Sequence, residues 1–236
     1  LGGDASGAGS PFERALGGWL CAECLGDYEG IRSPSCTRCG LPFRSEAGGE
    51  HLCGDCRTRP DAFERARAAG VYTRSLRDLI LAFKFKGQVG LAVPLGRLLY
   101  ETFERHWSPD EVDLILPVPL HPRRLRQRGY NQAYLLLRPW AQWHAAAHRQ
   151  PLPGRIERDL LRRVRVTTPQ TGLDRAARKR NLQKAFAVKR PMVCKDMRIL
   201  LVDDILTTGA TVNACARVLR RAGARRVEVL TLARVI

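Results

Sequence analysis

The segment with the clearest chemical potential joins an apolar run to two neighbouring carboxylates. Residues 199–202 are aliphatic, and Asp203 and Asp204 follow them directly. The block 207–211, with the sequence TTGAT, comes next and leads into an amphipathic pattern. A helix N-terminus behind a glycine can hold a phosphate through its N–H groups and its dipole. Carboxylates beside such a loop suit a sugar phosphate, because they accept hydrogen bonds from a diol or hold Mg²⁺ while the loop holds the phosphate.

A purely structural role for this block is the alternative. An acidic residue such as Asp203 can cap a strand, and a threonine can cap a helix. A cap needs one such residue, whereas residues 203–211 contain two acids and three threonines. The block therefore favours a ligand site.

Cysteine spacing indicates a second kind of site. Six of the eight cysteines form three C-x-x-C pairs, namely Cys21 and Cys24, Cys36 and Cys39, and Cys53 and Cys56. Each turn directs two thiolates at one point, and two turns complete a tetrahedral Zn²⁺ site with a structural role. Disulfides would need an oxidising compartment, and a thioredoxin-like redox pair would need a βαβ context that this segment lacks. Spacing alone does not decide which pairs share a zinc ion.

Charge and composition narrow the class of protein. The formal net charge of +17 favours anionic partners such as phosphates, nucleotides or nucleic acid, although a basic surface could also serve solubility alone. No stretch reaches the ~20 apolar residues that a membrane span requires. Residues 1–19 lack the basic start and apolar centre of a signal peptide and are expected to be disordered or non-native. We therefore expect a cytoplasmic protein with no membrane span.

The elements that must position these residues alternate along the chain. Helices are expected before Gly87, over residues 91–107, over 131–149 with a bend or break at Pro139, and over 209–222. Strands are expected over 111–120, 198–204 and 225–235, with shorter ones over 158–166 and 185–188. This alternation predicts an α/β fold with a parallel sheet flanked by helices, in which ligands bind at the carboxyl ends of the strands. We expect a zinc ribbon over residues 20–62 and the α/β domain over residues 63–236.

Residues 199–211 resemble the phosphoribosyl-pyrophosphate (PRPP) motif of type I phosphoribosyltransferases. That motif has four hydrophobic residues, two acids, two variable residues and then TTG-x-T. The resemblance implies that Asp203 and Asp204 bind the ribose hydroxyls and act as the catalytic pair. It also implies that the 5′-phosphate is held by Thr207, Thr208, Gly209, Ala210 and Thr211, and that Mg²⁺ accompanies PRPP.

Residues 20–236 as a whole resemble one branch of these proteins, the competence-associated ComF family. The similarity includes LPVPLHPRRLRQRGYNQA, residues 116–133, and the basic block that starts at Leu161. Relatives often carry four C-x-x-C pairs, and here the most N-terminal pair is absent. The resemblance implies that Cys36, Cys39, Cys53 and Cys56 form the complete site, which leaves Cys21 and Cys24 as orphans or further ligands.

Two basic stretches are expected to face the same ligand. Arg123, Arg124 and Arg128 follow a predicted strand end, and guanidinium groups suit pyrophosphate. Residues 155–190 hold 12 Lys or Arg against 3 Asp or Glu, a local charge of +9, and the resemblance implies a flexible hood over the substrate. The hood residues expected to act are Arg163, Arg165, Gln170, Arg178 and Asn181. A solvated basic face is the alternative.

Two functions follow from this pattern. In the first, a ComF-like protein binds PRPP or a related sugar phosphate and supports uptake of single-stranded DNA in natural transformation, with a DNA-uptake helicase as a partner. Tyr130, Trp140 and Trp143 are candidates for stacking on bases. In the second, the chain is an active phosphoribosyltransferase of nucleotide salvage or metabolism. A change in the ribbon is expected to leave ligand binding at the carboxylates unaffected.

Overall fold

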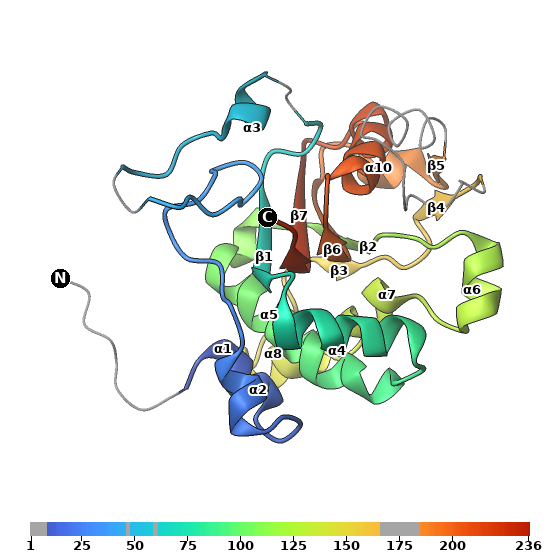
Figure 1. The fold of residues 1–236 in the computed structure, drawn as a ribbon. Coiled ribbons are helices and arrows are strands. Elements are labelled where there is room, and N and C mark those ends of the chain that lie inside the picture. The colour runs from blue at the N-terminus through green and yellow to red at the C-terminus, as the bar shows by residue number, and fades with distance from the viewer. Residues whose placement is uncertain (1–8, 46–47, 59–60, 166–184) are drawn as a thin grey trace.

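The centre of the molecule is a parallel β-sheet (Figure 1). A computed structural model describes residues 9–45, 48–58, 61–165 and 185–236. Five strands lie in the order β1-β7-β6-β2-β3, and every neighbouring pair is parallel. Their bounds are β1 Ala66–Val71, β2 Leu114–Pro117, β3 Arg155–Ile156, β6 Arg198–Leu206 and β7 Arg226–Arg234. The predicted α/β fold with a parallel sheet is confirmed.

Strand β6 lies in the middle of the sheet and separates two apolar cores. Leu200 and Val202 pack into one core, and Ile199 and Leu201 pack into the other. Because both faces are covered, the strand is a continuous aliphatic run rather than an alternating pattern. Strand β2 ends at Pro117, opposite Val202, whereas β7 continues alongside β6 to Leu206. The residues that follow Val202 therefore lie beyond the carboxyl end of β2.

Five helices cover one face of the sheet (Figure 1). They are α1 Pro11–Leu16, α4 Arg74–Phe85, α5 Ala92–His106, α7 Gln132–Leu137 and α8 Trp140–His148. Pro139 separates α7 from α8, as the sequence predicts, because proline removes a backbone donor and clashes with the preceding turn. Gly96 lets α5 and α7 approach closely, since a Cβ atom there would lie 2.7 Å from the carbonyl oxygen of Leu136.

Helix α10 (Ala210–Arg221) covers the opposite face together with a small second sheet (Figure 1). Strands β4 (Leu161–Arg163) and β5 (Phe186–Val188) pair antiparallel with each other. Both were predicted as strands, but they stand apart from the main sheet. Leu161 and Phe186 pack into the second core with Leu219 of α10, so apolar burial places the pair beside this helix.

The remaining elements are short. They are α2 Ala22–Gly26, α3 Gly54–Thr58, α6 Pro122–Arg128, and the 3₁₀ helices η1 Val89–Leu91, η2 Pro109–Glu111 and η3 Pro191–Cys194. Gly129 ends α6 with a φ of +82°, a left-handed conformation that favours glycine. Among the described residues, no helix combines the length and the apolar character needed to cross a bilayer.

The N-terminal segment differs from the expectation of disorder over residues 1–19. Within its described part, helix α1 is capped by Ser10 and buries Phe12 and Leu16 completely. Phe12 also stacks on Tyr28 with 4.1 Å between the ring centroids. Two apolar side chains spaced four residues apart are enough to dock one helical turn on α5, and this short signal is easily overlooked in a polar, glycine-rich segment.

Candidate functional site

A cavity of about 860 Å³ opens where strands β2 and β6 reach their carboxyl ends. Its polar and charged lining includes Lys84, Arg124, Gln127, Arg128, Asn131, Gln132, Arg163, Asp203, Asp204, Thr207 and Thr211. Most of these residues come from α4, α6, α7, β4, β6 and α10, while Asn131 directly precedes α7 and Thr207 directly follows β6. Chain segments far apart in sequence therefore meet at one edge of the sheet. The position agrees with the general rule for ligands of parallel sheets.

Asp203 and Asp204 border the cavity but have different surroundings. Asp204 is 8% exposed, and its Oδ1 atom lies 2.7 Å from Nζ of Lys84. Asp203 accepts a hydrogen bond of 2.9 Å from the backbone N–H of Asp204. Burial, together with the negative charge of Asp204, raises the pKa of Asp203 to about 7. One carboxylate therefore has a cationic partner, while the other changes its charge near neutral pH.

The loop 207–211 turns from β6 into α10. Gly209 occupies the position before the helix with a φ of +74°, where any other residue would be strained. Thr207 and Thr211 line the cavity, and α10 begins at Ala210 and is 12 residues long. The N-terminal N–H groups of this helix therefore border the cavity, which is the geometry of an anion-binding loop. Binding of phosphate at this loop stays a prediction.

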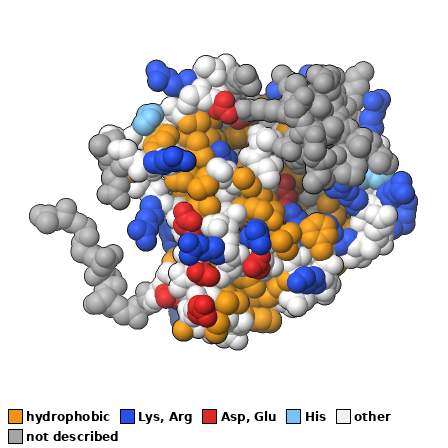
Figure 2. All heavy atoms as spheres, viewed as in Figure 1, with side chains coloured by type: hydrophobic (Ala, Val, Ile, Leu, Met, Phe, Trp, Pro, Cys, Tyr) orange, Lys and Arg blue, Asp and Glu red, His pale blue; other side chains and the backbone are white. Residues whose placement is uncertain are grey.

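Three arginines contribute positive charge to the cavity. Arg124 and Arg128 come from α6, and Arg163 comes from β4. Burial and the charge of Arg124 lower the pKa of Arg163. A buried guanidinium beside another cation is unfavourable, and a bound anion would relieve the repulsion. Figure 2 shows Lys and Arg side chains gathered over α6 at one edge of the molecule.

Other predicted residues fall elsewhere. Arg123 lies on α6 but not among the residues that line the cavity, and Arg165 is exposed outside it. Gln170, Arg178 and Asn181 lie outside the described residues. Trp140 is fully buried in the first core, so it is not a stacking surface.

Several lining residues were not predicted from the sequence, and three of them have contacts that matter for binding. Lys84 pairs with Asp204, 120 positions away, and Phe85 is 69% exposed with the guanidinium of Arg128 5.0 Å above its ring. Gln132 is 2% exposed, and its Nε2 atom has no hydrogen-bond partner among the described residues. A buried amide without a partner is unusual, and it marks a place where a ligand can accept a hydrogen bond. The alternation FKFKG was the available signal for the first two.

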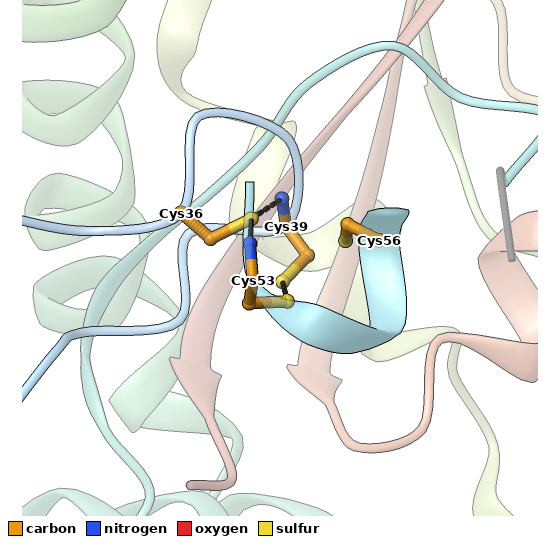
Figure 3. A group of neighbouring side chains, drawn as sticks. All are labelled: Cys36, Cys39, Cys53 and Cys56. Atoms are coloured by element: carbon orange, nitrogen blue, oxygen red, sulfur yellow. Dashed lines mark hydrogen bonds between the residues drawn. The ribbon is translucent and has the colours of Figure 1, made fainter. Parts of the chain in front are cut away.

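The ribbon brings four cysteines together (Figure 3). Cys36, Cys39, Cys53 and Cys56 are buried, and their sulfur atoms all lie within 4.8 Å of one another. Tetrahedral Zn²⁺ with Zn–S bonds of about 2.3 Å would separate two sulfurs by roughly 3.8 Å, and the Sγ atoms of Cys39 and Cys53 lie 3.7 Å apart. The cluster therefore fits a structural zinc ion. Cys21 and Cys24 are not part of it.

The backbone also prepares this cluster for a cation. Burial opposes ionisation of Cys36, but the N–H groups of Cys53 and Cys39 point at its sulfur and lower the pKa of the thiol to about 6. A thiolate is the form that binds zinc. The donor set and its surroundings thus agree with a zinc ribbon.

The ribbon lies directly beside the loop 207–211. A second cavity of about 330 Å³ is lined by three of the cluster cysteines and by Thr207, Thr208 and Gly209. Arg234, at the end of β7, donates a hydrogen bond of 3.3 Å to Sγ of Cys39. Asn213 of α10 donates a hydrogen bond to Asp61 and accepts one from the backbone N–H of Ala62, at the end of the segment predicted as the ribbon. The ribbon therefore contacts the loop 207–211, and whether a change in the ribbon leaves ligand binding at the carboxylates unaffected stays a prediction.

Two known domain families match this sequence. The double zinc ribbon domain matches residues 10–57, and the phosphoribosyl transferase domain matches residues 158–235. The first match extends over helix α1 and the cysteine cluster, and the second contains β6, the loop 207–211 and α10.

Relatives are similar along nearly the whole chain. The DNA utilization protein YhgH of Salmonella typhi is 35% identical, and the match covers 94% of this chain and 93% of that protein. Competence protein F of Haemophilus influenzae is 34% identical, with 89% of this chain and 90% of that protein covered. A solved structure of Trypanosoma cruzi hypoxanthine phosphoribosyl transferase aligns with 63% of this chain and 65% of its own at 14% identity, with a TM-score of 0.34. That structural likeness is too low to support a functional inference.

Proposed function

The chain belongs to the ComF family, and from this premise we propose that its large cavity binds PRPP or a closely related sugar phosphate. The observation that carries the proposal is the meeting of Asp203 and Asp204, the loop 207–211 and three arginines around one space. Each group matches a different part of such a ligand. A cavity that bound only phosphate would gain nothing from two carboxylates.

The ribose and the 5′-phosphate would lie between the carboxylates and the loop. Asp203 and Asp204 would accept hydrogen bonds from the two ribose hydroxyls, and charge-assisted bonds of this kind contribute about 1.5–3 kcal/mol each. Thr207, Thr211 and the N–H groups at the start of α10 would hold the 5′-phosphate. Lys84 would keep the charge of Asp204 balanced while Asp203 is ionised.

The pyrophosphate would lie towards the arginines. Arg124, Arg128 and Arg163 line the same cavity, and guanidinium forks bind phosphate oxygens bidentately. Mg²⁺ prefers oxygen ligands and retains several waters, so Asp203 and Asp204 fit an Mg²⁺ ion that arrives with the ligand. Bound there, the ion would neutralise charge on the leaving pyrophosphate. The arginines would orient that group and share its charge.

A role with single-stranded DNA is the second part of the proposal. The relatives carry the names DNA utilization protein and competence protein, and on that basis we propose that this chain supports DNA uptake. The four arginines of α6 and the net charge of +17 suit a phosphate backbone. Phe85, exposed at the rim beneath Arg128, suits stacking on a base. A DNA-uptake helicase is the partner that this role implies, and the cytoplasm is the compartment.

Turnover as a phosphoribosyltransferase is the competing function. The cavity of about 860 Å³ has room for an acceptor beside a sugar phosphate. The buried Nε2 atom of Gln132, which has no hydrogen-bond partner among the described residues, could donate to that acceptor. The reaction would break the bond between ribose C1 and pyrophosphate and form a new bond at C1, through an oxocarbenium-like state. Catalysis would come from positioning and charge stabilisation, with Asp203 and Asp204 as the central residues.

Calorimetry with PRPP and Mg²⁺ at pH 8 tests the site. Loss of two charge-assisted hydrogen bonds amounts to about 3 kcal/mol or more, so Asp203→Asn/Asp204→Asn should bind at least about a hundredfold more weakly. Asp78→Asn is the matched control, because it neutralises an exposed carboxylate whose ion pair, within the described part of the chain, is with its neighbour Arg77. Equal affinity of the double variant and the control would refute the site assignment.

Release of pyrophosphate distinguishes the two functions. The purified protein is incubated with PRPP, Mg²⁺ and each nucleobase in turn, and pyrophosphate is followed by a coupled assay. Turnover with any base, abolished in Asp203→Asn/Asp204→Asn, supports the enzyme. Tight binding of PRPP without turnover supports a ligand-binding role in DNA handling.

A further inference from the structure

We propose that Glu104, His144 and His148 form a second metal site, for a zinc-class divalent cation, separate from the ribbon and from the PRPP cavity. Among the described residues, this group and the four-cysteine cluster are the two places where three or more potential ligand atoms converge. Glu104 lies on α5 and the two histidines lie on α8. None of the three residues lines the cavity that holds Asp203 and Asp204.

Helical geometry places the two imidazoles together. His144 and His148 are four residues apart on α8, so they project from the same face of the helix. Their ring centroids lie 4.4 Å apart. Two histidines at this spacing with one carboxylate make a ligand set that zinc accepts, as in sites built from two histidines and a glutamate.

Distances within the group are close to those of a metal site. Oε1 of Glu104 lies 3.6 Å from Nδ1 of His144 and 2.6 Å from Nε2 of His148. With metal–ligand bonds of about 2.0–2.1 Å, tetrahedral coordination separates the ligand atoms by roughly 3.3 Å. For a cation to bind, the short distance between Nε2 of His148 and Oε1 of Glu104 must therefore lengthen, by less than about 1 Å. Both side chains are exposed enough to make this change.

A second layer of contacts orients the carboxylate. The hydroxyl of Tyr100 donates a hydrogen bond of 2.5 Å to Oε1 of Glu104. The same hydroxyl lies 2.9 Å from Nδ1 of His144, and a cation bound to Nδ1 would replace that second contact. Partners of this kind hold metal ligands in place, and their removal commonly weakens metal binding tenfold to a hundredfold.

Access from solvent is available on one side. The side chains of Glu104 and His148 are 31% and 47% exposed, whereas that of His144 is 7% exposed. The cation can therefore enter without unfolding, and water can supply the fourth ligand. Because α5 and α8 come from different parts of the chain, a bound ion would link the two helices and stabilise them against local opening.

A zinc titration of the full chain tests the proposal. Cys21 and Cys24 are replaced by serine to remove the thiol pair outside the four-cysteine cluster, and the ribbon is first saturated with one equivalent of Zn²⁺. We expect one further equivalent to bind, and Tyr100→Phe to bind it about tenfold more weakly. Cobalt in the second site should show tetrahedral d–d absorption without an added thiolate-to-cobalt band.

The matched variant keeps the number of histidines. His148→Ala/Ala146→His moves one imidazole to an exposed position two residues away, on another face of α8, and should lose the second equivalent. Glu104→Gln should lose it as well, and provides an independent variant if the first one is unstable. Absence of a second equivalent in the parent protein, or equal binding in both variants, would overturn the proposal.

Discussion

Replacement of Asp203 by asparagine should stabilise the protein at high pH while it removes a ligand contact. Burial and the charge of Asp204 raise the pKa of Asp203 from 3.8 to about 7. The folded state therefore holds a proton that the unfolded chain releases above about pH 4. Stability of the parent protein falls as pH rises from about 4 to 7, and asparagine, which cannot ionise, removes this contribution.

The expected gain in the free energy of unfolding follows from the raised pKa of Asp203. A difference of about 3 pKa units at ~1.4 kcal/mol per unit gives ~4 kcal/mol as the upper limit above pH 7, of which roughly 3 kcal/mol develops between pH 5 and pH 8. Lys84, which lowers the pKa of Asp203, remains in the variant and pairs with Asp204 alone. We therefore expect the variant to gain about 1–3 kcal/mol over the parent between pH 5 and pH 8.

Urea unfolding at several pH values measures this gain. The free energy of unfolding of Asp203→Asn should diverge from that of the parent as pH rises, and the divergence should level off above pH 7. Asp113→Asn is the control of opposite sign, because the side-chain hydrogen bond from Arg198 lowers the pKa of Asp113. That variant should be less stable than the parent at pH 8. A constant difference between Asp203→Asn and the parent from pH 5 to pH 8 would refute the reasoning.

Three further predictions concern the ribbon and the basic surface. One Zn²⁺ should bind per chain through Cys36, Cys39, Cys53 and Cys56. Metal analysis of Cys36→Ser/Cys53→Ser should show that this zinc is lost, and a full equivalent of zinc in that variant would contradict the assignment. Removal of that zinc, or the substitution Arg234→Gln, should weaken PRPP binding about tenfold, as measured by calorimetry. The reason is that Arg234 joins Cys39 to the strand beside the loop 207–211. Unchanged affinity would show that the ribbon and the loop are independent. Single-stranded DNA should bind less tightly as the salt concentration rises and should compete with PRPP, and Arg128→Ala should weaken the binding of both ligands. A flat salt dependence, or DNA that stays fully bound under saturating PRPP, would place the DNA site elsewhere.

Sequence patterns predicted the parts of this molecule that depend on local chemistry. The aliphatic run into Asp203 and Asp204 is contiguous, so its strand, its loop and the following helix could be assigned without tertiary information. The helix with Leu76 and Phe83 on one face also follows from a periodic pattern, and the structure confirms it. C-x-x-C spacing predicted thiols that converge, and the resemblance selected the four cysteines that do so.

The remaining features depend on contacts between distant segments. Lys84 reaches Asp204 because α4 packs against the sheet. The alternation FKFKG draws attention to this lysine, but no sequence pattern shows that its partner lies 120 positions away. Strand β1 is built from alanine, arginine and glycine with a single valine, so it lacks the β-branched pattern of a buried strand. Strand β3 has only two residues, which is too short for any periodicity.

A crystal structure of the protein with Mg²⁺ and PRPP tests the central claim most directly. We expect ribose hydroxyls within hydrogen-bond distance, about 2.6–3.0 Å, of the Asp203 and Asp204 carboxylates. We also expect the 5′-phosphate on the N–H groups of residues 207–211 and the pyrophosphate beside Arg124, Arg128 or Arg163. Electron density for the ligand away from both carboxylates, or none at saturating PRPP in crystals whose cavity is open to solvent, would contradict it.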